Sequence, residues 1–421
     1  MSDPTSPPPR IYRARILTPV PAPGAAVPPL RFEEDGALVV GAGGRILSVE
    51  PYARAAHPIA LDLHPHVLTP GFADVHLHFP QTRVIGRATG PLLDWLDRTV
   101  FPEEQRFSDE AYAREVGAEL MTRMLSAGTT CSGLYASSSP VATRVAFEVA
   151  ERAGVLAQIG LVLMDRGAPD GLLAPRDRAL ADLAALLADC HRPSGDLRLA
   201  ITPRFALSCS PELLRAAGAF AGEHALLVQT HLSENEVECE ATLAAFPGTA
   251  DYLGVYEACG LSADRSLFAH AIHLTDSEWD RIAAAKARIA HCPDSNFFLG
   301  SGRMRLREAL RRGVRVGLGS DVAAGRTFDM RRIAASAYDT ALAERDPVTP
   351  EELFSLATWC GADVLGFGDR TGALTPGRRA DFLALDVPAY ARTCEEVLAH
   401  VLFASDATPV RRTYVAGQIP R

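Results

Sequence analysis

The sequence predicts an α/β protein in which a (β/α)8 barrel of the TIM type carries a small β-sandwich formed from both chain ends. From residue 67 to about 370, short apolar runs typical of strands alternate with Ala/Leu/Arg-rich segments of helical period. The alternation gives eight strand–helix units, the number that closes a parallel barrel. Both ends of the chain carry strand-like runs and Pro/Gly-rich turns instead, which favours a separate β-structure.

Composition narrows the class of protein. The chain has 421 residues and a net charge of −9, and it contains no Lys/Arg block, which argues against nucleic acid or an anionic membrane as a partner. No stretch approaches the roughly 20 apolar residues of a membrane span. Eight cysteines are scattered without a C-x-x-C pair, which is typical of free thiols in a reducing compartment. The Ser/Pro-rich start lacks the apolar core of a signal peptide. We therefore expect a cytoplasmic protein.

Taken in order, the chain begins with a tail, residues 1–10, that we expect to be disordered. Strand-like runs at 11–17, 37–40 and 45–49 follow, separated by turns such as the Gly-Ala-Gly-Gly of residues 41–44. Residues 371–386 and 411–418 have the same character. We predict one β-sandwich domain from residues 11–66 and 371–421, with the barrel domain, 67–370, inserted between its two parts.

The first barrel strand follows Pro70 and Gly71 and ends in the H-x-H of residues 76–78. The other seven strands are expected at residues 128–134, 155–164, 197–208, 226–233, 266–274, 287–293 and 314–321. Helical period is clear at 177–190, 211–223 and 276–286.

The H-x-H pair is the first candidate for chemistry. Side chains alternate along a strand, so His76 and His78 point to the same side and lie a few ångströms apart. Two such imidazoles are a natural start for a metal site. Taken alone, the pair is equally well explained as two partly exposed histidines at a strand end.

Polar residues at the ends of later strands strengthen the metal interpretation, because catalytic groups of such barrels gather at that face. His231 and Glu234 follow the fifth strand, and His270 follows the sixth. Asp321 ends the eighth. Three histidines and one aspartate suit a zinc ion that keeps a water ligand. Singly, Glu234 could face a helix N-terminus, His270 could be a satisfied barrel residue, and Asp321 could cap a helix.

These motifs resemble the amidohydrolase superfamily, which is marked by P-G-F-x-D-x-H-x-H, then His231, His270 and the Gly-Ser-Asp that ends at Asp321. Within it, several stretches resemble the guanine deaminases. They are Pro80-Gln81, L-L-D-W-L at 92–96, F-P-E at 101–103, T-P-R-F at 202–205, H-L-S-E-N at 231–235, A-H-C-P at 290–293 with Ser295-Asn296, and G-L-G-S-D at 317–321. The similarity spans roughly residues 65–370.

The resemblance implies a sandwich-flanked barrel, a homodimer, and hydrolysis of the small purine guanine to xanthine and ammonia. It implies one zinc ion per chain, with iron as the other candidate. The implied metal ligands are His76, His78, His231 and Asp321. His270 would contact the metal-bound water, Glu234 would shuttle protons, and Asp321 would share in catalysis. Gln81, Arg204 and Phe205 lie where the family holds the purine, together with His231, Glu234 and Asp321.

Two departures from the family pattern leave the exact substrate open. The family usually has glycine where this chain has Ala271, and the loop 322–329 carries Arg326 where a small hydroxyl residue is expected. A deaminase or dehalogenase of another amino-substituted purine or triazine therefore stays an alternative. A non-catalytic scaffold on the same fold is a more remote one, since fold does not imply function.

A single lysine, Lys286, limits the number of metal ions. Binuclear members of the superfamily bridge two ions with a modified lysine at a strand end, whereas Lys286 lies in a helical stretch before the seventh strand. We therefore expect one ion. The H-x-E and P-C-x-x-C signature of the other zinc deaminases is absent from the sequence. Glu236 and Glu238 are expected on the solvated face of the helix after Glu234.

Overall fold

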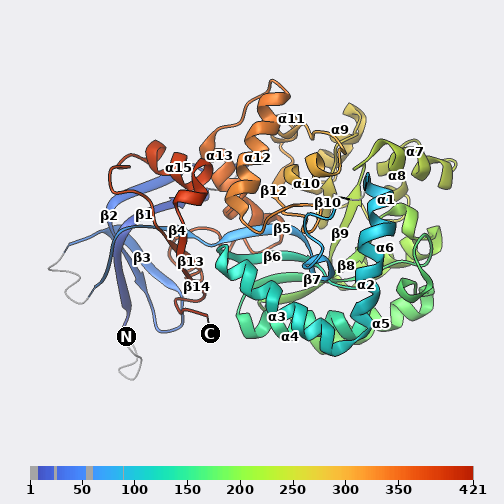
Figure 1. Cartoon of the computed structure of the whole chain (residues 1–421), viewed down its shortest axis with the longest axis horizontal. Coiled ribbons are helices and arrows are strands. Elements are labelled where there is room, and N and C mark those ends of the chain that lie inside the picture. Colours follow the sequence, from blue (N-terminus) through green and yellow to red (C-terminus); the bar gives the residue numbers. More distant parts are fainter. Residues whose placement is uncertain (1–7, 23–25, 54–59, 89, 421) are drawn as a thin grey trace.

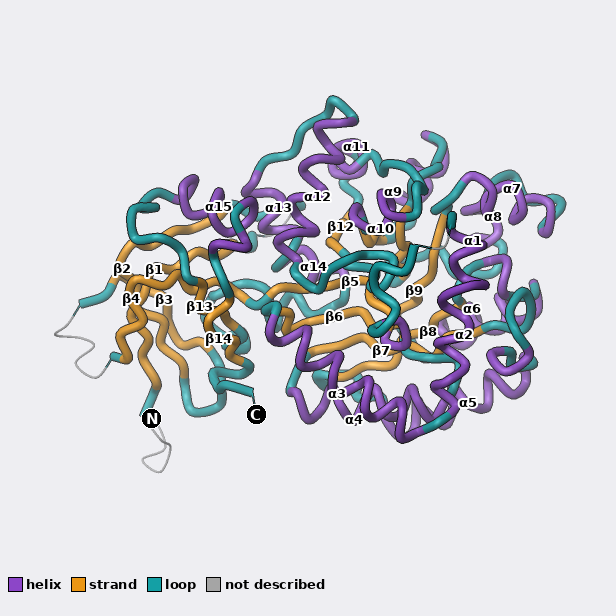
Figure 2. The backbone as a smooth tube through the Cα atoms, viewed as in Figure 1, coloured by secondary structure: helices purple, strands orange, loops and turns teal. Residues whose placement is uncertain are grey.

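The computed structural model describes residues 8–22, 26–53, 60–88 and 90–420, and it has two parts (Figure 1). A barrel of eight parallel strands is surrounded by helices, and a six-stranded sheet made from both chain ends lies at one side of it (Figure 2). The predicted barrel is confirmed, and so is a separate β-structure made from both chain ends; where we predicted a sandwich, the structure has a single six-stranded sheet. Of the expected N-terminal tail, residues 1–7 lie outside the described residues, and Arg10 already begins a strand.

The six-stranded sheet has the order β14-β13-β4-β1-β2-β3. Its strands are β1 (Arg10–Pro19), β2 (Leu30–Val40), β3 (Ile46–Pro51), β4 (Leu61–Pro70), β13 (Phe382–Leu385) and β14 (Val410–Tyr414). β4 joins the two chain ends, because it pairs in parallel with β1 and antiparallel with β13. The chain therefore passes from β4 directly into the barrel, and the C-terminal segment completes the sheet to which β4 belongs.

The two faces of this sheet belong to different cores, as strand alternation requires. Ile16 and Leu68 pack in a cluster of the sheet's own, together with Phe382. Their neighbours Leu17 and Val67 pack in the large cluster that also holds the barrel's helices. The sheet is thus attached to the barrel by a continuous apolar contact.

The barrel strands run in the order β5 to β12, and successive strands pair in parallel. They are β5 (Phe72–His78), β6 (Thr129–Tyr135), β7 (Leu156–Leu163), β8 (Leu197–Pro203), β9 (Leu227–Leu232), β10 (Ser266–His270), β11 (Arg288–His291) and β12 (Arg315–Leu318). Several end two to five residues before the predicted position. At the end of β10 the backbone enters the left-handed region at His270 and Ala271, so the ladder stops there. Ser233, just after β9, and Asp321, three residues after β12, have the same conformation.

The seam between the first and last strands lies at their carboxyl ends. The Asp321 amide donates to the His76 carbonyl at 2.8 Å, and the His78 amide donates to the Val322 carbonyl at 3.2 Å. Buried Asp74 reinforces the seam, since its Oδ1 accepts from the Ser320 amide at 2.8 Å and from the His76 amide at 3.3 Å. Closure of the barrel therefore brings His76 and His78 to Asp321.

Helices cover the outside of the barrel. They include α3 (Glu110–Ser126), α4 (Pro140–Ala153), α5 (Arg176–Cys190), α6 (Pro211–His224), α9 (Asp276–Ala284), α12 (Met330–Ala343) and α13 (Pro350–Leu356). Between β5 and α3 the chain makes an excursion through α1 (Leu92–Trp95), a π-helical turn and α2 (Phe101–Glu104), which contributes one wall of the site. Within the described residues, no helix is both long and apolar enough to traverse a bilayer.

Candidate active site

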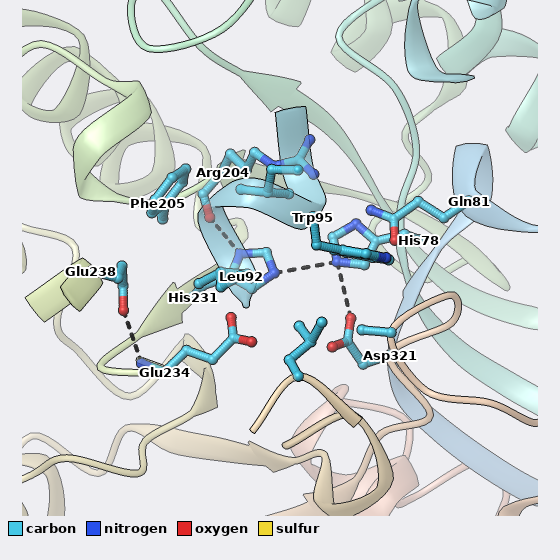
Figure 3. A pocket seen from close by; sticks show the side chains of 13 residues that line it. His78, Gln81, Leu92, Trp95, Arg204, Phe205, His231, Glu234, Glu238 and Asp321 are labelled. Carbon is cyan, nitrogen blue, oxygen red and sulfur yellow. Dashed lines mark hydrogen bonds and ion pairs between the residues drawn. The ribbon is translucent and has the colours of Figure 1, made fainter. Parts of the chain in front are cut away.

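A pocket of about 390 Å³ opens at the carboxyl ends of the strands (Figure 3). The residues that line it are His78, Gln81, Leu92, Trp95, Leu96, Arg204, Phe205, His231, Glu234, Glu238, Leu299, Asp321 and Ala324. Every residue that the sequence suggested for substrate binding is among them.

A buried cluster of histidines and one aspartate forms the floor of the site. One ligand atom from each of His76, His231, His270 and Asp321 lies within 4.8 Å of the others. His78 belongs to the same cluster, because its Nε2 is 3.3 Å from Asp321 Oδ1 and 3.2 Å from His231 Nε2. The structure thus brings the four predicted ligands and His270 together, and the choice of His78 over His270 as a ligand stays a prediction.

The histidines and the aspartate of the cluster are in the protonation states that favour binding of a cation. Burial lowers the pKa of His76 to about 4 and that of His231 well below its usual range. Burial opposes ionisation of Asp321, but the adjacent His76 and His78 outweigh it and hold the pKa of that carboxyl well below its usual range. Neutral imidazoles beside a carboxylate are the forms that bind a metal ion.

Two buried nitrogens of the cluster also need a partner. Nε2 of His76 and Nε2 of His270 have no hydrogen bond within the described residues, although carboxylate oxygens lie 3.2 and 3.5 Å away. Buried polar atoms are rarely left unsatisfied, because desolvation without a partner costs free energy. The residues present therefore fit a divalent cation.

Two imidazole rings of the cluster form hydrogen bonds through Nδ1, and these bonds determine that Nε2 is the nitrogen available to a metal ion or a proton. His231 Nδ1 lies 2.6 Å from the Arg204 carbonyl oxygen, and His270 Nδ1 lies 2.8 Å from Asn296 Oδ1. Both oxygens can only accept, so Nδ1 carries the proton and Nε2 keeps its lone pair when the ring is neutral.

Glu234 is placed to handle protons. Its Oε2 lies 3.5 Å from His270 Nε2, and its Oε1 accepts a weak hydrogen bond of 3.4 Å from Ser301. Burial raises the pKa of Glu234 to about 7, which lets this carboxyl both hold and release a proton near neutral pH.

Glu238 corrects one expectation. Glu236 is exposed as predicted, but Glu238 is fully buried and lines the pocket. It is the third residue of α7 (Glu236–Ala245), and in a capping box with Asn235 its carboxylate turns back to accept from the Glu234 and Asn235 amides at 3.0 and 3.2 Å. The N-x-x-E spacing of residues 235–238 was the sequence signal for this arrangement.

One further acidic residue lies directly behind the wall to which the sequence assigned the purine. Arg204 Nη1 donates to Glu104 Oε2 at 2.6 Å, and Gln81 Nε2 donates to Glu104 Oε1 at 3.3 Å. Sequence reasoning missed Glu104, because only the fold brings α2 to β8. Arg204 thus pairs with a carboxylate and also lines the pocket.

The two departures from the family pattern have structural explanations. Arg326 forms an ion pair of 2.5 Å with Asp294, its side chain is 53% exposed, and it is not part of the pocket lining, to which the same loop contributes Ala324. Ala271 has φ +52°, a conformation that favours glycine, which accounts for the glycine expected there. Neither departure changes a group that faces the pocket.

The chain belongs to the amidohydrolase family, whose model matches residues 67–419. Its relatives include guanine deaminases. That of Escherichia coli K12 is 35% identical over 405 residues, which cover 93% of this chain and 92% of the relative. The probable guanine deaminase of Deinococcus radiodurans is 37% identical over 431 residues, with 97% and 98% covered.

Solved structures of guanine deaminases are also similar to this chain. Escherichia coli guanine deaminase has a TM-score of 0.92 at 33% identity and covers 97% of this chain and 99% of its own. Guanine deaminase from C. acetobutylicum, solved with guanine bound in the active site, has a TM-score of 0.89 at 28% identity, with 98% and 100% covered. Together the family and these relatives indicate a hydrolase that acts on C–N bonds.

Proposed function

We propose that the protein hydrolyses guanine to xanthine and ammonia with one zinc ion per chain, held by His76, His78, His231 and Asp321. The observation that carries this proposal is the composition of a single pocket. It combines the buried His/Asp cluster, a proton-carrying carboxyl at Glu234 and a guanidinium at Arg204. In Figure 3, Arg204 and Glu234 lie on opposite sides of His231, and all three residues line the pocket.

The residues divide the chemistry between them. When bound, the metal ion supplies a water of lowered pKa. Glu234 protonates a ring nitrogen of the base while the water oxygen bonds to C2, the carbon that carries the amino group. Asp321, assisted by His270, takes the proton that the water releases and passes it to the amino nitrogen. The C2–N bond then breaks and ammonia leaves, while the proton of the new C2 hydroxyl returns to Glu234, so that C2 becomes the carbonyl carbon of xanthine. General acid–base steps of this kind contribute roughly 10²–10⁴-fold each.

Arg204 supports guanine over adenine. A guanidinium offers only donors, and guanine presents a carbonyl oxygen where adenine presents an amino group. A hydrogen bond to a charged group is worth about 1.5–3 kcal/mol, and a donor left facing a donor costs a similar amount. Discrimination of several orders of magnitude is therefore within reach of this contact.

The test is to incubate purified protein with guanine, adenine, cytosine and amino-triazines while xanthine and ammonia are measured, with metal analysis on the same sample. We expect turnover of guanine alone, and we expect Arg204→Ala to lose guanine turnover without losing metal. Turnover of a triazine or of adenine instead, or protein that binds metal and turns over nothing, would replace this proposal with another enzyme or with a scaffold.

The proposal extends to a cytoplasmic homodimer. All eight cysteines are free, which suits a reducing compartment. The dimer rests on the resemblance to the family, and light scattering after size-exclusion chromatography measures it.

A further inference from the structure

Glu104 is a buried carboxylate directly behind the pocket wall. It is the last residue of α2, 5% exposed, and it is not itself part of the pocket lining. One carboxylate oxygen accepts from Arg204 at 2.6 Å, and the other accepts from Gln81 at 3.3 Å. Glu104 therefore links two residues that are far apart in sequence and that both face the substrate pocket.

The first consequence concerns the Gln81 amide. Its Oε1 accepts from the Ala323 amide at 3.1 Å, while its Nε2 donates to Glu104. A flipped amide would place Oε1 against the carboxylate and Nε2 against an N–H group, so Glu104 and Ala323 together fix its orientation. Gln81 is then left with one free N–H donor and one free acceptor lone pair for a ligand.

The second consequence concerns charge. The Arg204 side chain is 4% exposed, and its charge is balanced by Glu104, whose side chain is 6% exposed. The pair offers the donors of a guanidinium without a net positive charge. Removing one partner of such a pair leaves the other charge buried and uncompensated, and an anion would then be attracted to it.

We propose that Glu104 is a positioning and specificity-determining residue. It orients Gln81 and neutralises Arg204, so that the pocket binds a neutral oxo-purine in preference to a purine anion. This rests on the proposed function insofar as guanine is the neutral ligand. Glu104 does not line the pocket, and it acts through its hydrogen bonds with Arg204 and Gln81.

The central experiment is Glu104→Gln, which keeps the shape of the side chain. It removes the negative charge and sets an amide against the two donors. We expect kcat/KM for guanine to fall roughly 10- to 100-fold, mostly through a higher KM, with metal content unchanged. We also compare binding of urate, an anion at neutral pH, with binding of neutral hypoxanthine. Glu104→Gln should shift the ratio of the two dissociation constants about tenfold or more towards urate.

Two further variants separate positioning from folding. Glu103→Gln alters the neighbouring buried carboxylate, which pairs with Arg106 at 3.0 Å and with Tyr112 outside the pocket, and it should leave both KM and the urate ratio unchanged. The double variant Glu104→Gln/Arg204→Gln has a neutral pair again. Its urate ratio should return to the wild-type value although guanine binding stays weak.

Binding is measured by calorimetry, which requires no turnover. If the wild type does not deaminate guanine, the proposed function fails while the urate ratio still tests Glu104. An unchanged KM and urate ratio in Glu104→Gln would overturn the inference. So would equal losses in Glu103→Gln and Glu104→Gln, because α2 would then matter only for folding.

Discussion

Glu234 owes its chemistry to its surroundings. The side chain is buried next to His270, its pKa is raised to about 7, and its amide is held by Glu238. Glu234→Gln keeps the shape but cannot carry the proton, so we expect kcat to fall roughly 10²–10⁴-fold while metal stays bound. Steady-state kinetics with metal analysis measures both.

The matched control is Glu236→Gln, which removes an exposed carboxylate from the same helix and should behave as wild type. Near-normal turnover by Glu234→Gln would move the proton-carrying role to Glu238, the other buried carboxylate at this wall.

At the scale of residues, the sequence reveals those functional groups that a short motif or a predicted strand end marks. The H-x-H pair and the polar residues at strand ends could be predicted, because a parallel barrel brings all its strand ends to one face. Glu104 could not, because its role depends on the path of the α1–α2 excursion. Glu238 was misplaced because helical period alone assigns it to the solvent side, whereas a capping box turns it inward.

Among the elements, the seam between β5 and β12 is the junction on which the site depends. Asp74 accepts two backbone hydrogen bonds there. Asp74→Ala leaves buried donors unpaired, so we expect the free energy of unfolding to fall by roughly 1–3 kcal/mol and metal per chain to drop. Denaturant unfolding and elemental analysis test this. Asp177→Ala, at an 83% exposed side chain on α5, is the control. An unchanged metal content in Asp74→Ala would refute the link between seam and site.

Helix α13 provides a test with a defined pH dependence. Glu352 closes a capping box with Thr349 and accepts two hydrogen bonds from Arg307. Burial alone would raise the pKa of Glu352, but the hydrogen bonds from Arg307 and Thr349 outweigh it and lower the pKa below 4.5. A lowered pKa contributes stability above the ordinary value, and that stability is lost as pH falls through the folded-state pKa.

Glu352→Gln should therefore destabilise the protein by roughly 1–2 kcal/mol at neutral pH. The difference from wild type should shrink steadily as pH drops below 4.5, the usual glutamate pKa. Chemical denaturation at several pH values measures it, with exposed Glu351→Gln as the reference. A difference that grows in acid would contradict the assignment.

The number of barrel strands could be predicted from the sequence better than the residues at which each strand begins and ends. The alternation of apolar and helical segments predicted all eight barrel strands, but several of them end earlier than predicted, and at β10 left-handed residues at His270 and Ala271 end the strand. In the N-terminal sheet, β2 begins at Leu30, seven residues before the predicted run at 37–40, because the largely charged residues 31–35 do not show the pattern of a strand. Pairing with β1, for example Phe32 opposite Leu17, extends that strand. Such register depends on partners that local pattern does not reveal.

For the whole molecule, the prediction is one tightly held metal ion per chain. Lys286 is exposed and precedes β11, so it lies at the end of that strand opposite the histidine cluster and cannot bridge a second ion. Elemental analysis of well-loaded protein should give one ion, and a finding of two would contradict this. Removing the ion with a chelator should abolish turnover and lower Tm, because an ion that binds only the folded state stabilises it.

The seam also sets the order in which this protein becomes functional. His76 and His78 emerge early in synthesis, and Asp321, just beyond the strand that completes the ring, follows more than two hundred residues later. A growing chain on the ribosome therefore cannot assemble the full cluster until nearly all of the barrel exists. The proposed metal site is therefore complete only after β12 has met β5.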